Sequence, residues 1–192
     1  MSIIKHLCQQ HQLKQRIADN RSRLFRMAYA WGHNADLAND LAQEAMAKAL
    51  KNLSQLREPE ALDSWLFGIL ANCWRDHFRR QREHVDIEDV TLTDEATPER
   101  LHQRQDIIDL VRGAVAHLVE GQRHVLTLVD LEGFSYTEVA NILGIPVGTV
   151  MSRLSRARSQ LAGIVLAQHG ARDDNCLLYT SPSPRDRTRS RM

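Results

Sequence analysis

Apolar residues recur at spacings of three, four and seven along most of this 192-residue chain, and this periodicity restricts the fold more than any other feature. Such spacing places the apolar residues on one stripe of an α-helix. It predicts three amphipathic helices in the first half of the chain, within 13–32, 35–53 and 57–82. Gly32 ends the first of them, and Pro59 stands in a first helical turn, where proline is tolerated. Three helices of this kind form a compact bundle.

A second helical block follows an acidic segment that shows little periodicity. Further helices are predicted over 107–118, 121–133 and 136–143, with a last one from Val147 onward. Aromatic residues make up only 5% of the chain and charged residues 26%, which is more typical of a soluble helical protein than of a β-sandwich. The sequence therefore predicts an all-α protein.

The two helical blocks are expected to be separate small domains. The first covers 1–82 and the second 100–168, and the second is a helix-turn-helix domain. A flexible acidic linker over 83–99 joins them. No window approaches the length of a signal peptide core or a membrane span. We therefore expect a cytoplasmic protein that does not insert into a membrane.

The cysteines and histidines form no pattern that indicates a bound group. Cys8, Cys73 and Cys176 are far apart and form no C-x-x-C pair, and the nine histidines lack metal-ligand spacing. The chain also lacks a Walker-type or Rossmann glycine pattern and a defensible Ser-His-Asp grouping. We expect no metal, no cofactor and no catalytic residue, and hence a protein that is not an enzyme.

The net charge of +1 hides two basic segments that flank an acidic one. Residues 75–82 carry four Arg against one Asp, and residues 149–161 carry three Arg and no acid. Between them, residues 83–99 carry seven acids and no Lys or Arg. Charge that is concentrated in this way makes the two basic segments candidates for contact with nucleic acid.

The tail, 169–192, changes character abruptly. We interpret residues 176–192, CLLYTSPSPRDRTRSRM, as read-through of a sequencing adapter, so that the natural sequence beyond about residue 175 is unknown. The alternative is a disordered Pro/Ser/Arg-rich tail with weak electrostatic affinity for nucleic acid. The segment is left out of the arguments on fold and function.

The second domain ends in a predicted helix-turn-helix. Ser135 and Glu138 form a capping-box pattern that opens the helix 136–143, Gly-Ile-Pro follows as a turn, and Val147 begins the last helix. On that last helix, one face is apolar and is expected to pack on the preceding helices; it consists of Val150, Leu154, Ala157 and Leu161.

The opposite face of the last helix has two interpretations. It carries Thr149, Ser152, Arg153, Arg156 and Gln160, and it could be an ordinary solvated face. We favour a DNA-binding face, because it lacks acidic residues for the usual i,i+4 pairs and has small polar residues near its N-terminus, where a recognition helix meets base edges. Arginine can bind guanine or phosphate, and Ser and Thr can do either. This pattern alone fits many regulators.

The complete pattern resembles the extracytoplasmic-function (ECF) group of bacterial sigma factors. The family's −35-binding region is similar to LEGFSYTEVANILGIPVGTVMSRLSRARSQL, residues 131–161. Two further family motifs resemble DLAQEAMAKAL, residues 40–50, and SWLFGILANCWRDHFRR, residues 64–80. Together they cover roughly residues 20–166 in the expected order. Two domains in order are far more specific than one helix-turn-helix.

The resemblance implies particular contact residues. Those implied for the −35 element are Thr149, Met151, Ser152, Arg153, Ser155 and Arg156. Met151 stands where the family commonly has Lys or Arg, and Ser155 where some members have a larger residue, so the −35 sequence is not predicted. Those implied for docking on core polymerase are Asp40, Gln43 and Glu44, which would otherwise be a solvated helix face.

The resemblance also implies that the first domain captures the −10 element as a single strand. Asn72 and the loop Leu56–Ala61 would lie near a flipped base, and the residues that would hold phosphates are Arg75, Arg79 and Arg80. Two tryptophans are candidates for stacking on a base. Trp65 lies on the apolar stripe and is expected to pack in the core, whereas the sequence leaves the role of Trp74 open.

The partners implied by the resemblance are core RNA polymerase, through its β′ coiled coil and its β flap, promoter DNA in duplex and melted form, and a separate anti-sigma protein as inhibitor. The function would be transcription initiation at promoters with −10 and −35 elements. The alternative is a stand-alone helix-turn-helix regulator whose first domain senses a ligand or dimerises. A nucleic-acid enzyme is a third interpretation, for which no catalytic carboxylates or metal cluster stand out.

Overall fold

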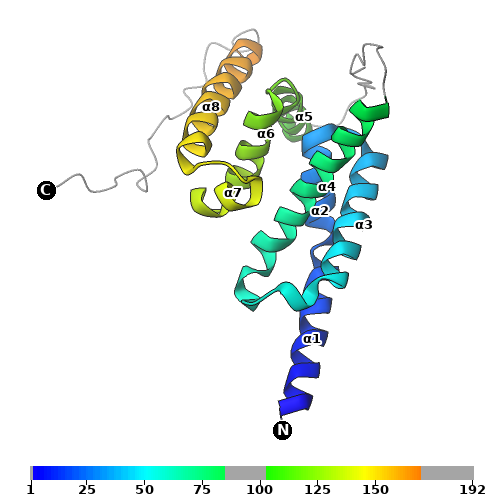
Figure 1. The fold of residues 1–192 in the computed structure, drawn as a ribbon. Helices are drawn as coiled ribbons and strands as arrows, with labels where there is room; N and C mark the ends of the chain where they lie inside the picture. Colours follow the sequence, from blue (N-terminus) through cyan, green and yellow to red (C-terminus); the bar gives the residue numbers. More distant parts are fainter. Residues whose placement is uncertain (1, 85–102, 170–192) are drawn as a thin grey trace, which may run out of the picture.

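The computed structural model describes residues 2–84 and 103–169, and within these ranges every regular element is a helix. The first range contains α1 (Ser2–Asp19), α2 (Arg21–Gly32), α3 (Ala35–Lys51), the short 3-10 turns η1 (Leu53–Gln55) and η2 (Pro59–Ala61), and α4 (Leu62–His84). The second contains α5 (Gln103–Ala116), α6 (Glu120–Leu126), the π-helical turn η3 (Thr127–Leu131), α7 (Tyr136–Leu143) and α8 (Val147–His169). The expected all-α fold with two helical domains is confirmed (Figure 1).

The first domain is a bundle in which α3 packs against both α2 and α4. Its chain reversals are set by local chemistry. His33 adopts a left-handed conformation, with φ of 51°, and ends α2. The side chain of Asn34 then accepts a hydrogen bond from the Leu37 amide at 2.9 Å and caps α3. The predicted apolar stripes are buried, and Ile17, Leu24, Leu41, Ala45, Leu66 and Leu70 are each at most 1% exposed.

The segment predicted as one helix over 13–32 is two helices, and this part of the prediction is wrong. The break falls at Asn20, between α1 and α2. The Asn20 side chain donates to the carbonyl of Arg16 at 2.9 Å, and its own amide is shared between the carbonyls of Arg16 and Ile17 at 3.2 Å each. An asparagine side chain competes in this way with the regular helical ladder.

The second domain packs α6 and α7 against α8, and α5 also contacts α8. Its core consists of residues from every one of these helices and from the π-helical turn; they include Ala114, Leu118, Val125, Leu128, Val139, Ile142, Val150, Leu154 and Ala157. Val111, an apolar residue of the helix predicted over 107–118, is 38% exposed. On α8, Val150, Leu154 and Ala157 of the predicted packing face are buried.

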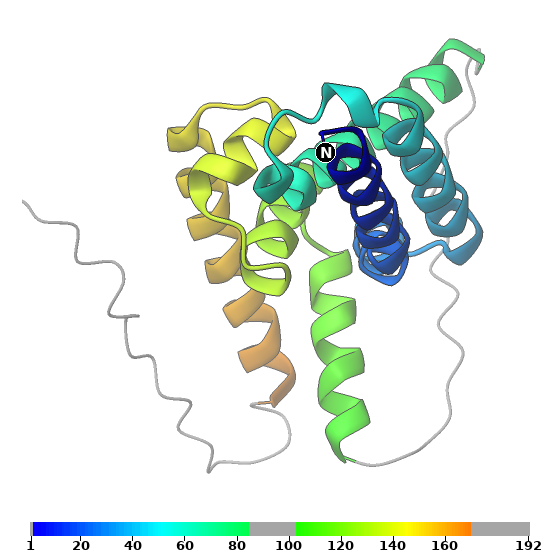
Figure 2. The ribbon, with the colours of Figure 1, turned by 90° about the horizontal axis from the view of Figure 1, so that it is seen from below.

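The two domains are not separate in space, because α7 packs along α4 and one continuous core runs through both. Figures 1 and 2 show α7 and α8 on one side of α4 and α3 on the other. The rings of Phe67 on α4 and Phe134 before α7 meet edge to face, with centroids 5.1 Å apart. Most of the linker predicted at 83–99, and the tail from residue 170, lie outside the described residues.

Candidate nucleic-acid interface

Local hydrogen bonds fix the turn between α7 and α8. Ser135 Oγ accepts from the backbone N–H of Glu138 at 3.3 Å, and Glu138 Oε2 accepts from the backbone N–H of Ser135 at 2.8 Å, which is the predicted capping box. Gly144 ends α7 with φ of 65°, a conformation that favours glycine. The Pro146 carbonyl then accepts from the Thr149 amide at 2.9 Å in the first turn of α8. The geometry of the helix-turn-helix is therefore fixed by hydrogen bonds between residues that are close together in the sequence.

The two faces of α8 differ in burial as the periodicity predicted. Val150, Leu154 and Ala157 are buried, with Leu161 half-buried. Among the residues implied for the −35 element, Met151, Ser152, Ser155 and Arg156 are exposed, whereas Thr149 and Arg153 are half-buried. Met151 is an apolar side chain that is 54% exposed on an otherwise polar face. The arrangement presents hydroxyls, a guanidinium and one thioether to a partner.

The two arginines of this face have different surroundings. The guanidinium of Arg153 lies over the start of α6, since a Cβ placed on Gly121 would be 3.0 Å from Arg153 Nη1. Arg153 therefore contacts the protein's own second domain, whereas Arg156 is exposed. A third arginine, Arg158, forms an ion pair of 2.7 Å with Asp130 of the π-helical turn, a partner that lies outside its own helix.

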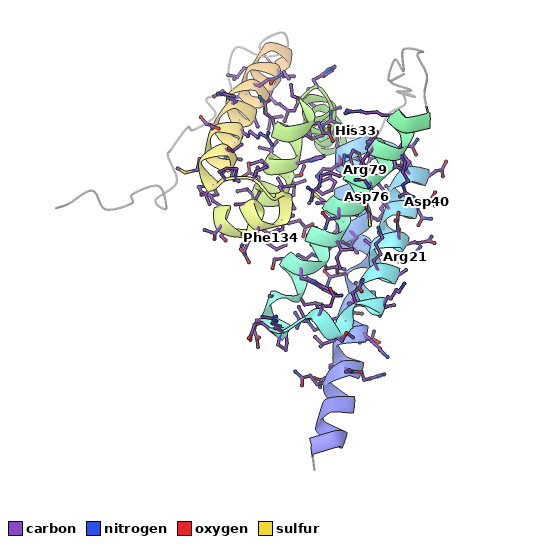
Figure 3. All side chains as sticks on the ribbon, in the orientation of Figure 1. Arg21, His33, Asp40, Asp76, Arg79 and Phe134 are labelled. Atoms are coloured by element: carbon purple, nitrogen blue, oxygen red, sulfur yellow. The ribbon has the colours of Figure 1, made fainter. Side chains whose placement is uncertain are left out.

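The residues implied for the −10 element lie together on α4. Asn72, Arg75, Arg79 and Arg80 are all exposed. They are held by local contacts: Arg75 hydrogen-bonds to Asn72, Arg79 forms a 3.2 Å ion pair with Asp76, and Arg80 lies 3.7 Å from Glu44 of α3. Exposed pairs of this kind contribute little stability, so they can be exchanged for phosphate contacts. In Figure 3, Asp76 and Arg79 lie on α4, beside α3, which carries Asp40.

The residues implied for core polymerase occupy one side of α3. Asp40 and Gln43 are exposed and Glu44 is half-buried. The carboxylate of Glu44 accepts a hydrogen bond from Lys48 Nζ at 2.9 Å. This contact is the main reason why the pKa of Lys48 is raised. Of the two carboxylates, Asp40 is therefore the more available to a partner.

A pocket of about 390 Å³ lies where α4 of the first domain meets α6 of the second. Its walls combine two aromatic rings, three guanidinium groups and one carboxylate; they are Trp74, Phe78, Arg75, Arg79, Arg82 and Glu120. Arginines beside aromatic rings are the side chains that proteins use to hold the backbone and bases of single-stranded nucleic acid. The sequence did not reveal this pocket, because Glu120 lies far from α4 along the chain.

The contact between the domains, which we call the interdomain seam, is centred on two tryptophans of the first domain. Trp31 Nε1 donates to Thr127 Oγ1 at 2.9 Å, and Trp74 Nε1 donates to Glu120 Oε1 at 2.7 Å. Arg123 donates to the Trp31 carbonyl and to two carbonyls of its own domain. A second group of charges also joins the domains. Arg23 of the first domain lies 2.8 Å from Glu132 of the second and 2.7 Å from Asp63 of its own domain.

His124 of α6 is buried between these two tryptophans. Its ring centroid lies 4.3 Å from that of Trp31 and 5.5 Å from that of Trp74. Burial lowers the pKa of His124 to about 4, and this outweighs the opposite effect of Glu120, whose carboxylate lies 3.8 Å away. At neutral pH His124 is therefore uncharged, and its contact with Glu120 is not an ion pair.

Acid is therefore expected to weaken the folded protein through His124. Between pH 6.5 and 4 the unfolded chain binds a proton that the folded chain excludes, so the contribution of His124 is complete above pH 6.5 and is lost as the pH falls toward 4. Relative to a His124→Leu variant, the wild-type protein should lose about 2 kcal/mol of unfolding free energy between pH 7 and pH 5. Urea unfolding of both proteins at several pH values measures this, and parallel profiles would contradict it.

Neither a membrane span nor a metal site is found among the described residues. None of the helices in 2–84 and 103–169 combines the length and apolar character needed to cross a bilayer. In the same ranges, no group of three or more His, Cys, Asp or Glu side chains is placed to hold a metal ion.

Two family models match the chain in sequence. The model for sigma-70 region 2 matches residues 16–84, and the model for sigma-70 region 4 matches residues 108–161. The first therefore covers α2 to α4 with their polar faces, and the second covers the helix-turn-helix. A sensing or dimerisation domain in the first half of the chain is not favoured by this match.

Relatives with known names agree with these models. The chain is 36% identical to the ECF RNA polymerase sigma factor EcfG of Rhodopseudomonas palustris over 140 residues, which are 73% of this chain and 77% of the relative. It is also 36% identical to the RNA polymerase sigma-H factor of Pseudomonas aeruginosa over 141 residues, 67% of this chain and 73% of the relative.

Solved structures show the same likeness in three dimensions. The sigma factor RpoE of Bartonella quintana, solved in complex with the anti-sigma factor NepR, has a TM-score of 0.64 and 30% identity, over 80% of this chain and 96% of that one. CnrH, solved in complex with the cytosolic domain of CnrY, has a TM-score of 0.59 and 26% identity, over 82% of this chain and 90% of that one.

Proposed function

The chain belongs to the ECF group of the sigma-70 family and is a transcription-initiation factor, and from this premise we propose how its surfaces divide that task. It binds core RNA polymerase in the cytoplasm and directs it to promoters that carry −10 and −35 elements. Residues 1–82 serve the polymerase and the −10 element, 83–99 link the domains, and 100–168 serve the −35 element. The observation that carries the proposal is that regions 2 and 4 occur in order in one chain, each with an exposed polar helix face.

The −35 element is bound by α8 in the major groove. The contact residues are Thr149, Met151, Ser152, Arg153, Ser155 and Arg156. Support comes from the exposure of most of this face and from the capping box, which holds α7 and the turn in place. Arg156 can donate to guanine, while the hydroxyls can bind base edges or phosphates.

The −10 element is bound as a single strand by α4. Asn72 and the loop Leu56–Ala61 lie near the flipped base, and Arg75, Arg79 and Arg80 hold phosphates. These arginines are exposed and form only weak surface pairs, which supports their exchange for phosphate. Four arginines within 75–82 give the strand an electrostatic path.

Two protein partners complete the proposal. Core polymerase contacts Asp40, Gln43 and Glu44 on α3 through its β′ coiled coil, and its β flap contacts the second domain. An anti-sigma protein holds the factor inactive. The support for this inhibitor is that both structural neighbours were solved with an inhibitor or a partner domain, RpoE with NepR and CnrH with CnrY.

The role of Arg156 is tested by removing its side chain. An Arg156→Ala variant should lose about 1–3 kcal/mol of binding free energy at the −35 element if the guanidinium contacts a base. The loss should disappear on promoters with a changed base at the contacted position. Quantitative transcription from matched promoter pairs measures the difference. An equal loss on every promoter would show a phosphate contact instead, and no loss would remove Arg156 from the interface.

Assembly with polymerase distinguishes the proposed function from the stand-alone regulator. Purified protein and bacterial core polymerase are mixed and separated by size-exclusion chromatography, and duplex DNA binding by the protein alone is measured in parallel. The proposal predicts co-elution with core polymerase and weak, unspecific duplex binding without it. Tight sequence-specific duplex binding with no co-elution would instead establish the regulator.

A further inference from the structure

Trp74 belongs to the first domain and is buried between that domain and α6 of the second. It lies on α4 between Asn72 and Arg75, yet it is only 3% exposed. One part of its surroundings is its own domain, where a Cβ on Gly32 would be 2.8 Å from the ring. Another part is α6, which accepts the indole N–H with Glu120 at 2.7 Å and places His124 edge to face at 5.5 Å. Among the described residues, the hydrogen-bond acceptor of this indole N–H therefore belongs to the second domain.

The pocket beside Trp74 has the chemistry of a single-strand site. Trp74 and Phe78 lie with their ring centroids 4.7 Å apart, and Arg75, Arg79 and Arg82 line the same space. Aromatic faces take stacked bases and arginines take phosphates. Two of these arginines, Arg75 and Arg79, already belong to the proposed −10 surface. The pocket thus extends that surface toward the interdomain seam.

Glu120 occupies this pocket with a negative charge. Its carboxylate accepts from Trp74 and shares the pocket with three arginines, and its side chain is 57% exposed. A bound single strand would place a phosphate beside these arginines, and the carboxylate of Glu120 already occupies that position with a negative charge. Because Glu120 belongs to α6 of the second domain, it leaves the pocket when the domains separate.

We propose that Trp74 is a further contact for single-stranded promoter DNA, and that packing of α6 on α4, with Glu120 in the arginine pocket, masks it. This inference rests on the proposed −10 function of α4. The strand and α6 compete for the same residue, so DNA binding and domain packing oppose each other. By linkage, single strands favour the open seam, and a change that weakens the seam raises the apparent affinity for single strands.

The test measures, by fluorescence anisotropy, the binding of the full 192-residue chain to a fluorescein-labelled pool of short, random-sequence single-stranded DNA. This probe requires neither a promoter nor polymerase. A Glu120→Ala variant removes the acceptor of the indole N–H and the charge in the pocket, and its affinity should rise about tenfold over wild type. Asp36→Ala is the matched control, because it removes one exposed carboxylate from α3, and its affinity should rise by much less.

A second variant identifies Trp74 as the residue responsible. Trp74→Leu keeps an apolar side chain against Gly32 but has no aromatic face, and circular dichroism checks that it folds. Combined with Glu120→Ala, it should lose about tenfold in affinity relative to Glu120→Ala alone. The proposal is overturned if Glu120→Ala binds no better than Asp36→Ala, or if the double variant binds as tightly as Glu120→Ala.

These outcomes are separable from those of the proposed function. If the protein does not assemble with polymerase but Glu120→Ala still gains affinity through Trp74, the polymerase role fails and the masked single-strand site stands. If assembly succeeds and the anisotropy shows no gain, the masked site fails and the initiation role stands.

Discussion

A Trp31→Ala variant is expected to lose about 3–5 kcal/mol of unfolding free energy, which is a large share of the stability of a domain of this size. Trp31 is 1% exposed and lies at the centre of the interdomain seam. Its removal leaves a cavity, ends the hydrogen bond to Thr127, and removes the ring that packs against His124. Urea unfolding followed by circular dichroism measures the loss.

Trp65 provides the matched control for this prediction. It has the same side chain and lies in the same domain, but it is only partly buried and packs at the edge of the core. Trp65→Ala should therefore cost clearly less than Trp31→Ala. Equal losses, or a loss of less than about 1 kcal/mol at Trp31, would contradict the packing of the two domains against each other.

Reversing the charge of Asp40 is expected to reduce the affinity for core polymerase by roughly 100-fold, or about 3 kcal/mol. Asp40 is an exposed carboxylate on the α3 face that we assign to the polymerase. An Asp40→Lys variant places a like charge against a partner surface that accepts an acid, which costs several kcal/mol at a protein interface. Competition binding against labelled wild-type protein measures the change.

Asp36→Lys is the control on the same helix. Asp36 is also exposed but lies in the first turn of α3, one turn before Asp40. The Asp36→Lys variant makes the same change of charge as Asp40→Lys, so a general electrostatic effect would appear equally in both variants. The assignment of the α3 face fails if Asp36→Lys and Asp40→Lys weaken polymerase binding to the same extent.

The helix-turn-helix could be predicted from the sequence because it depends on interactions between near neighbours. The capping box joins residues three apart, and Gly144 ends α7 in the one conformation that favours glycine. The packing face of α8 follows from a spacing of three and four, and Val150, Leu154 and Ala157 are buried accordingly. For such features, local sequence and tertiary structure agree.

The interdomain seam could not be predicted, because its contacts join residues that are distant in the chain. Trp31 and Thr127 are 96 residues apart, and Trp74 and Glu120 are 46 apart. Periodicity shows that Trp31 is on an apolar stripe but not that it also contacts Thr127 and His124 of the other domain. Periodicity also does not decide whether Trp74 is a core residue or a surface residue, since it lies between the core and the polar face of α4.

The position of Arg153 shows a further limit of the helical pattern. Periodicity places it on the exposed face with Arg156, yet it is half-buried over the start of α6. The reason is Gly121, which has no side chain to keep the guanidinium away. The break at Asn20 is similar, because a side chain that bonds to the backbone interrupts a helix whose apolar spacing continues.

The central claim is that this chain enables RNA polymerase to begin transcription at defined sites. Run-off transcription with purified core polymerase on a library of promoter-containing genomic fragments tests it most directly, with the 5′ ends of the transcripts sequenced. We predict transcripts that begin at discrete positions only when the protein is added, downstream of paired −10 and −35 elements. The claim is contradicted if core polymerase with and without the protein gives the same transcripts while the protein alone binds a duplex operator tightly.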